Sequence, residues 1–268
     1  MSRKSTKLNK LPNKFGDLSQ SMVGYHNHID FRFFDDFDDE DFAFLMKNIS
    51  GVNMLDLNET AITDESIKLL LDLEYINELR VKECRNLTND CTEILNKLTT
   101  LVFLHLKNTE ITIDGLLKLK NLTNLKTLLF SADDPTNIKE KLINLKIMLL
   151  QCEIIINSKR YYFNAIELFI YFLKNKPYLF QLKIKNENIS TEWSNWLIQP
   201  NEDSIEAEFQ GAYAINSIEW IEIKPLTFNV ITEEYDYFAE LIILLKYLEF
   251  PFMINNGIMS LYILENEI

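Results

Sequence analysis

The sequence predicts an α/β protein in two parts, a stack of short strand–helix units with a parallel sheet followed by a small α+β domain. Three observations support this fold class. An apolar motif recurs about every 24 residues in the first half, and each copy is followed by a segment with helical periodicity. After about residue 155 the recurrence stops, and aromatic-rich segments with other periods follow. The domain boundary is therefore expected near Asn157.

The recurring motif has the form L-x-x-L-x-L-x-x-N/C/T-x-L. Its three clearest copies are Val52, Leu55, Leu57, Thr60 and Ile62; Ile76, Leu79, Val81 and Cys84, with one extra residue before Leu87; and Leu101, Leu104, Leu106, Thr109 and Ile111. This pattern resembles that of leucine-rich-repeat proteins. The resemblance implies a short solenoid with a parallel sheet and return helices, whose exposed sheet face binds a protein partner.

The elements of the first half follow from this register. Residues 1–23 are expected to form a basic, flexible leader, and residues 24–156 the solenoid. Its first strand should place His28, Phe31 and Phe33 at the motif positions, as an aromatic capping unit with a helix from Phe42 to Ile49. The expected return helices are Asp64–Leu73, Asn89–Leu98 and Asp114–Leu119, with Thr63, Thr88 and Thr112 as N-caps. Leu125, Leu128 and Phe130 continue the series, and Leu145, Met148 and Leu150 form a degenerate last copy.

Residues between the buried apolar positions should form the exposed face of the sheet. Its predicted rows are Arg32, Asp56, Arg80, His105 and Leu129; Asp30, Met54, Glu78, Phe103 and Thr127; and Phe34, Asn58, Lys82, Lys107 and Ser131. Both charge signs occur there beside Met54 and Phe103, which suits a protein partner. The candidate partner-binding residues are Arg32, Met54, Asp56, Glu78, Arg80, Lys82, Phe103, His105 and Lys107. Arg80 and Phe103 are the expected anchors, although the convex or lateral surfaces are alternatives.

Residues 157–268 are expected to form an α+β domain. The expected elements are a helix over Phe163–Leu173, a strand over Tyr178–Ile184, an irregular segment containing Trp193 and Trp196, a strand over Ser217–Ile223, a helix over Phe238–Leu248, and a hairpin around Asn256-Gly257. The run Ser217–Ile223, with the Trp193/Trp196 region before it, resembles a small uncharacterised bacterial domain family associated with toxin-immunity loci.

Charge and composition narrow the class of partner. The net charge is −13, and the first fourteen residues contribute five cations and no acid, so the rest of the chain carries −18. An acidic body disfavours nucleic acid and anionic membrane surfaces and favours a basic protein. No stretch has the length or apolarity of a membrane span, and Cys84, Cys91 and Cys152 form no disulfide framework. A cytoplasmic location is therefore expected.

Residue patterns that could carry catalysis or bind a metal have structural interpretations. The chain has six glycines and no Gly-rich phosphate loop. His26 and His28 share one strand face, but no third ligand is placed by the sequence. The acidic run Asp35–Asp41 lacks the spacing of a calcium loop and suits the N-terminus of a helix. Glu219 and Glu222 point to opposite faces of a strand. No metal and no cofactor are expected.

The sequence thus predicts a non-enzymatic protein-binding module. The leading hypothesis is a bacterial immunity protein that binds and neutralises a toxin domain, with fast, salt-sensitive association. The alternative is a cytoplasmic adaptor that recruits another protein through its repeats. An enzyme housed in residues 157–268 is the third and least favoured interpretation.

Overall fold

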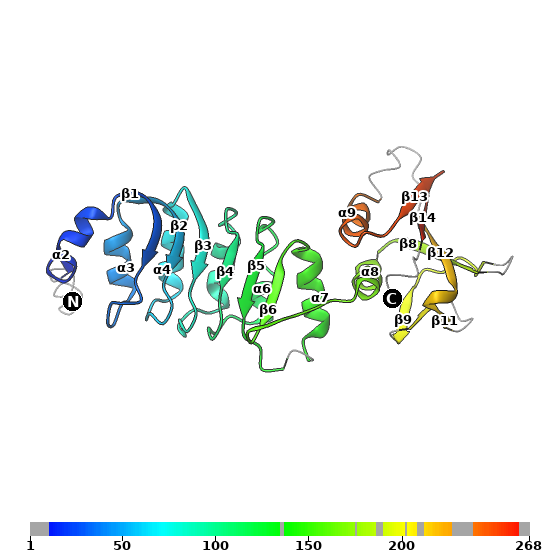
Figure 1. Ribbon diagram of the computed structural model, residues 1–268, viewed down its shortest axis with the longest axis horizontal. Helices are drawn as coiled ribbons and strands as arrows, with labels where there is room; N and C mark the ends of the chain where they lie inside the picture. The colour runs from blue at the N-terminus through cyan, green and yellow to red at the C-terminus, as the bar shows by residue number, and fades with distance from the viewer. Residues whose placement is uncertain are drawn as a thin grey trace. The chain divides into compact units, whose positions relative to one another are not determined.

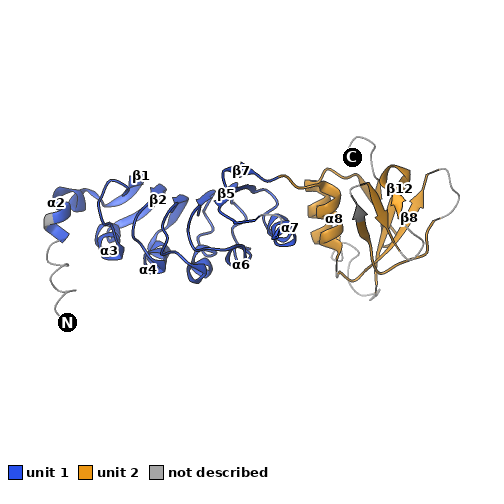
Figure 2. Cartoon of the chain, turned by 90° about the horizontal axis from the view of Figure 1, so that it is seen from below, with its two compact units in different colours: residues 1–161 blue, residues 162–268 orange. Residues whose placement is uncertain are grey.

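The chain separates into two compact units, Met1–Tyr161 and Tyr162–Ile268 (Figure 2). A computed structural model describes residues 11–134, 137–174, 176–185, 190–201, 203–207, 212–226 and 238–262. The division falls just after the boundary expected near Asn157. None of the described helices is both long enough and apolar enough to cross a membrane.

Unit 1 is built on a seven-stranded sheet whose strands follow one another in chain order (Figure 1). The first six strands are parallel, and β7 pairs antiparallel with β6. The helices lie along one side of this sheet (Figure 2). The elements are α2 (Leu11–Ser21), β1 (Gly24–Asp30), α3 (Asp39–Met46), β2 (Ile49–Asp56), α4 (Asp64–Leu69), η1 (Leu70–Asp72), β3 (Tyr75–Arg80), η2 (Asn89–Cys91), α5 (Thr92–Leu95), β4 (Phe103–His105), α6 (Ile113–Leu116), β5 (Thr127–Phe130), α7 (Lys139–Met148), β6 (Glu153–Ile156) and β7 (Lys159–Arg160).

The apolar positions of the motif form the core of unit 1, between the sheet and the helices. One column of the ladder consists of Ile29, Leu55, Leu79, Leu104, Leu128 and Ile154. Each of these side chains is at most 5% exposed. Full burial of an aliphatic side chain stabilises the fold by about 1.5–3 kcal/mol. The spacing of the motif therefore sets the register between neighbouring strands.

Polar residues begin the helices as the sequence predicts. Thr63 accepts a hydrogen bond from the backbone N–H of Glu65, and Thr88 accepts one from Asp90. Thr112 also occupies an N-cap position but makes no side-chain capping bond. The expected helix N-terminus in the acidic run is confirmed, since Asp38 and Asp41 form a capping box at the start of α3. These caps satisfy backbone N–H groups that the helix itself cannot pair.

Several expectations for unit 1 differ from the structure. The helix expected from Phe42 to Ile49 is Asp39–Met46, because Ile49 begins β2. The return helices expected over Asp64–Leu73 and Asn89–Leu98 each divide into an α-helical and a 3₁₀ part. The leader was expected to be flexible to residue 23, but residues 11–21 form α2, because Leu11 and Phe15 are buried. The first strand is shifted by two residues, since His26 and Ile29, not His28 and Phe31, pair with Val52 and Leu55. Leu145 and Met148 lie in α7, and the sixth parallel strand is β6.

Unit 2 contains a four-stranded antiparallel sheet of order β13-β14-β12-β8 and a three-stranded antiparallel sheet of order β11-β10-β9. Its elements are α8 (Ala165–Leu173), β8 (Tyr178–Ile184), β9 (Ile198–Asn201), β10 (Ser204–Glu206), β11 (Tyr213–Ala214), η3 (Ile215–Ser217), β12 (Ile218–Pro225), α9 (Ala239–Tyr247), β13 (Phe252–Asn255) and β14 (Ile258–Tyr262). The hairpin prediction is confirmed, because Asn256 and Gly257 both have positive φ, 53° and 73°, between β13 and β14.

The core of unit 2 lies where α8 and α9 pack with the larger sheet, around buried Phe169, Phe180 and Leu241. The segment containing Trp193 and Trp196 was expected to be irregular, but part of it forms β9 and β10. Its strands are short and carry polar residues at Asn201, Ser204 and Glu206, so they lack the apolar alternation by which a strand is recognised.

Candidate functional site

The candidate site is the face of the unit 1 sheet opposite the helices, at the ends of β2, β3 and β4. We call its six strand residues the outer face: Met54, Asp56, Glu78, Arg80, Phe103 and His105. The register between strands pairs Met54 with Glu78 and Glu78 with Phe103. It also pairs Asp56 with Arg80 and Arg80 with His105. These residues therefore lie in the two neighbouring rows that the sequence predicts for β2 to β4.

Arg80 and Phe103 contact each other at the centre of the outer face. The Arg80 guanidinium carbon lies 5.1 Å from the centroid of the Phe103 ring, which is a cation–π geometry. The same guanidinium donates to Glu78 through Nη2 at 3.1 Å. Phe103 in turn meets the His105 ring edge to face, with centroids 6.3 Å apart. Arg80 and Phe103 are both partly exposed, so this arrangement is accessible to a partner.

The shift of β1 changes the position of Arg32. Asp30, not Arg32, pairs with Asp56 in the ladder, and Arg32 follows the end of the strand. Its guanidinium still reaches the row, since Nη2 lies 2.6 Å from Asp30 and Nε lies 3.4 Å from Asp56. Asp56 is only 2% exposed, so it supports Arg32 and is itself hardly accessible. The hydrogen bonds from Arg32 lower the pKa of Asp30.

Lys82 and Lys107 follow β3 and β4 directly and border the outer face. Lys82 Nζ lies 3.3 Å from Glu59, and Lys107 Nζ donates to the Ser158 hydroxyl at 2.8 Å. Both lysines are close enough to act on His105. Burial lowers the pKa of His105, and the positive charges of Lys82, Arg80 and Lys107 lower it further. His105 is therefore held toward its neutral form within a group of cations.

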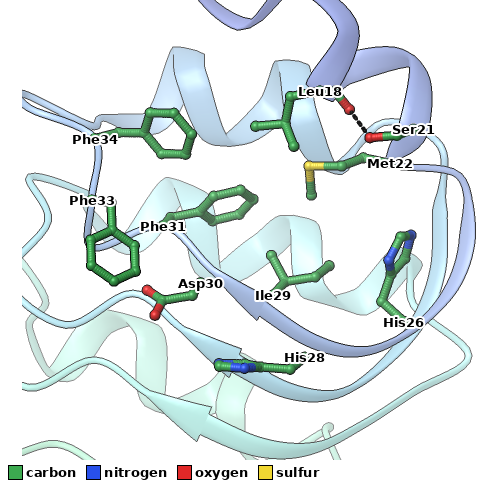
Figure 3. A pocket seen from close by; sticks show the side chains of 10 residues that line it. All are labelled: Leu18, Ser21, Met22, His26, His28, Ile29, Asp30, Phe31, Phe33 and Phe34. Atoms are coloured by element: carbon green, nitrogen blue, oxygen red, sulfur yellow. Dashed lines mark hydrogen bonds between the residues drawn. The ribbon is translucent and has the colours of Figure 1, made fainter.

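A pocket that sequence reasoning missed lies beside β1 (Figure 3). It has a volume of about 280 Å³, with apolar walls from Leu18, Met22 and Phe33 and polar groups from His26 and Asp30. Figure 3 shows Leu18 and Met22 on one side of the pocket and His26 and Ile29, from β1, on the other. The alternation of His26 and His28 is a sequence signal for this strand, but α2 supplies the opposite wall and was not expected.

The three cysteines and the candidate metal ligands have structural surroundings. Cys84, Cys91 and Cys152 are free and buried, and burial raises the pKa of each thiol. The Cys84 thiol donates to the Leu57 carbonyl, and the hydroxyls of Thr60 and Thr109 donate to the carbonyls of Leu57 and Leu106. Across the described ranges, no group of three or more His, Cys, Asp and Glu side chains is arranged to hold a metal ion.

Comparison with known proteins matches no family model to this chain and finds no similar curated sequence. The fold and the site define a mixed α/β protein, with a mostly parallel seven-stranded sheet in one unit and antiparallel sheets in the other.

Proposed function

We propose that the chain is a non-enzymatic protein-binding module whose first unit is a leucine-rich-repeat solenoid. The motif spacing and the parallel register of β1 to β6 support the solenoid, because each buried column continues from strand to strand. The observation that carries the binding function is the partly exposed Arg80–Phe103 contact in the middle of the outer face. Arginine and aromatic side chains often supply most of the energy of a protein interface.

The proposed contact surface is the outer face together with Arg32, Lys82 and Lys107 at its border. Met54 and Phe103 supply apolar contact area, and Glu78, Arg80 and His105 supply hydrogen-bonding groups. The proposed partner is a bacterial toxin domain that the chain neutralises in the cytoplasm. The net charge of −13 supports a partner that is basic overall, because such a charge speeds the encounter of oppositely charged proteins. The resemblance of Ser217–Ile223 to domains associated with toxin-immunity loci also supports a toxin domain as the partner.

The test is calorimetry between the chain and the product of the adjacent gene, at low and at raised salt. We expect binding that weakens with salt. Phe103→Ala should weaken it by about thirtyfold, as removal of a 2 kcal/mol interface anchor does. The matched control is Lys118→Ala, since Lys118 is exposed on the helix side and pairs with Glu93 at 3.7 Å. Unchanged affinity in Phe103→Ala, or no binding at low salt, contradicts the proposal.

A further inference from the structure

Two nitrogen atoms at the centre of the outer face are buried without a hydrogen-bond partner in the described parts of the chain. They are Nε of Arg80 and Nε2 of His105. Arg80 and His105 are cross-strand partners on β3 and β4, so their side chains leave neighbouring strands toward the same face. Buried polar atoms of this kind are costly to leave unpaired, and they are usually paired with protein, water or a ligand.

The charges around this pair are of both signs, and those that act most on His105 are positive. Lys82 and Lys107 stand beside His105, and Lys107 has a neutral partner, the Ser158 hydroxyl. Three carboxylates also lie near: Glu78 contacts Arg80 at 3.1 Å, Glu59 contacts Lys82 at 3.3 Å, and Asp56 is engaged by Arg32 at 3.4 Å. Arg80 and Lys82 thus each lie beside a carboxylate, and Lys107 is the cation of this group that contacts a hydroxyl instead. The nearby carboxylates disfavour a dianion more than a monoanion.

We propose that Arg80 and His105 form a carboxylate-binding subsite, which takes one Asp or Glu side chain of the protein partner. This inference rests on the proposed function and names the chemistry of its central contact. Adjacent strands are about 4.8 Å apart, so donors on two neighbouring strands can each reach one oxygen of a carboxylate. The Phe103 ring lies 5.1 Å from the Arg80 guanidinium carbon and helps to fix the position of that side chain. The partner is then basic overall but presents one acid at this point.

The subsite has a readout in the free chain. A carboxylate bound at His105 stabilises the imidazolium form, so it raises the pKa of His105. The chain has three histidines, so the His105 ring signals can be assigned by substitution and followed by NMR as pH is varied. The probes are N-acetylglutamate amide and N-acetylglutamine amide, which differ only in the side-chain carboxylate, at matched ionic strength. We expect only the glutamate probe to raise the pKa of His105.

Variants assign the effect to the subsite. Arg80→Gln should weaken the response to the glutamate probe by about tenfold or more, since a charge-assisted hydrogen bond is lost. Arg85→Gln is the matched control, because Arg85 is exposed, lies in the turn after β3 and pairs with Glu83 at 3.3 Å. Its response should equal that of the wild type. The comparison between the two probes needs no variant, so it remains decisive if Arg80→Gln does not fold.

Three results overturn the inference: equal responses to the two probes, no response to either, or a larger response to inorganic phosphate than to the glutamate probe. The last result assigns the site to phosphate groups. Because this experiment contains no partner, its outcome is separate from that of the proposed function. The proposed function fails when Phe103→Ala binds the adjacent gene product as the wild type does.

Discussion

The Asp64 carboxylate accepts two hydrogen bonds from Thr88, one from its backbone N–H at 2.9 Å and one from its hydroxyl at 2.6 Å. The two residues are 24 positions apart. Asp39 holds Thr63 in the same way, at 2.8 and 2.7 Å. The side chain at the start of one helix therefore fixes the N-cap residue of the next, and it joins successive strand–helix units by polar contacts outside the sheet.

Asp64→Ala should lower the free energy of unfolding by about 1–3 kcal/mol, because the Thr88 N–H loses its acceptor in a partly buried position. Urea denaturation measures the change. Asp90→Ala is the control, since Asp90 is an exposed acid in the first turn of the following helical segment. Equal losses in the two variants would mean that the Asp64–Thr88 contact does not stabilise the stack.

Gly51→Ala should also destabilise unit 1. A Cβ at this position would lie 2.6 Å from the Tyr75 ring, which stacks with the Tyr25 ring at a centroid distance of 6.0 Å. Overpacking of this kind typically costs about 1–3 kcal/mol. In a Tyr75→Ala background the same substitution should cost far less, because the clashing ring is gone. A double-mutant cycle by urea denaturation checks this, and equal costs in both backgrounds would refute the close approach.

The buried thiols should resist alkylation. Burial raises the pKa of Cys152 to about 12, and it raises the pKa of Cys84 and Cys91 as well, so little thiolate forms near neutral pH. Iodoacetamide with mass spectrometry should modify all three cysteines in urea and almost none in the native chain. Rapid native modification of any one of them would show that its surroundings open readily.

The sequence was most informative where leucine spacing alone sets the structure. The columns through Leu55, Leu79 and Leu104 were predictable because only one register buries every leucine. The first strand was misplaced by two residues because Phe31 and Phe33 offered an aromatic match to the motif. In the structure Phe31 is 1% exposed and stacks on Phe37 with ring centroids 4.6 Å apart, whereas Phe33 is 81% exposed.

Features that depend on contacts between distant residues were not predictable. Thr88 can donate hydrogen bonds to Asp64 only when the two strand–helix units that contain them lie side by side. The same holds for the pocket beside β1, since its walls come from α2 and from β1. The rows of the outer face from β2 to β4 were predicted, but the contact between Arg32 and the buried Asp56 was not, because it depends on the shifted first strand.

The stability of unit 1 should fall on acidification partly through His105. Burial first, and then the positive charges of Lys82, Arg80 and Lys107, lower the folded pKa of His105 below its ordinary value of 6.5. The unfolded chain therefore binds more protons between the two pKa values, and stability decreases as pH falls through that range. His105→Gln should reduce the loss of unfolding free energy between about pH 7 and about pH 5. His28→Gln is the control, because His28 is exposed. If His105→Gln lost as much unfolding free energy on acidification as the wild type, His105 would not contribute to the pH dependence.

The most direct test of the outer face as the binding surface is photocrosslinking to the product of the adjacent gene. The photoreactive residue p-benzoylphenylalanine replaces Met54, which is partly exposed on β2, or Leu71, which is 41% exposed on the helix side. We expect a covalent adduct from position 54 and none from position 71. An adduct from position 71 without one from position 54 would contradict it.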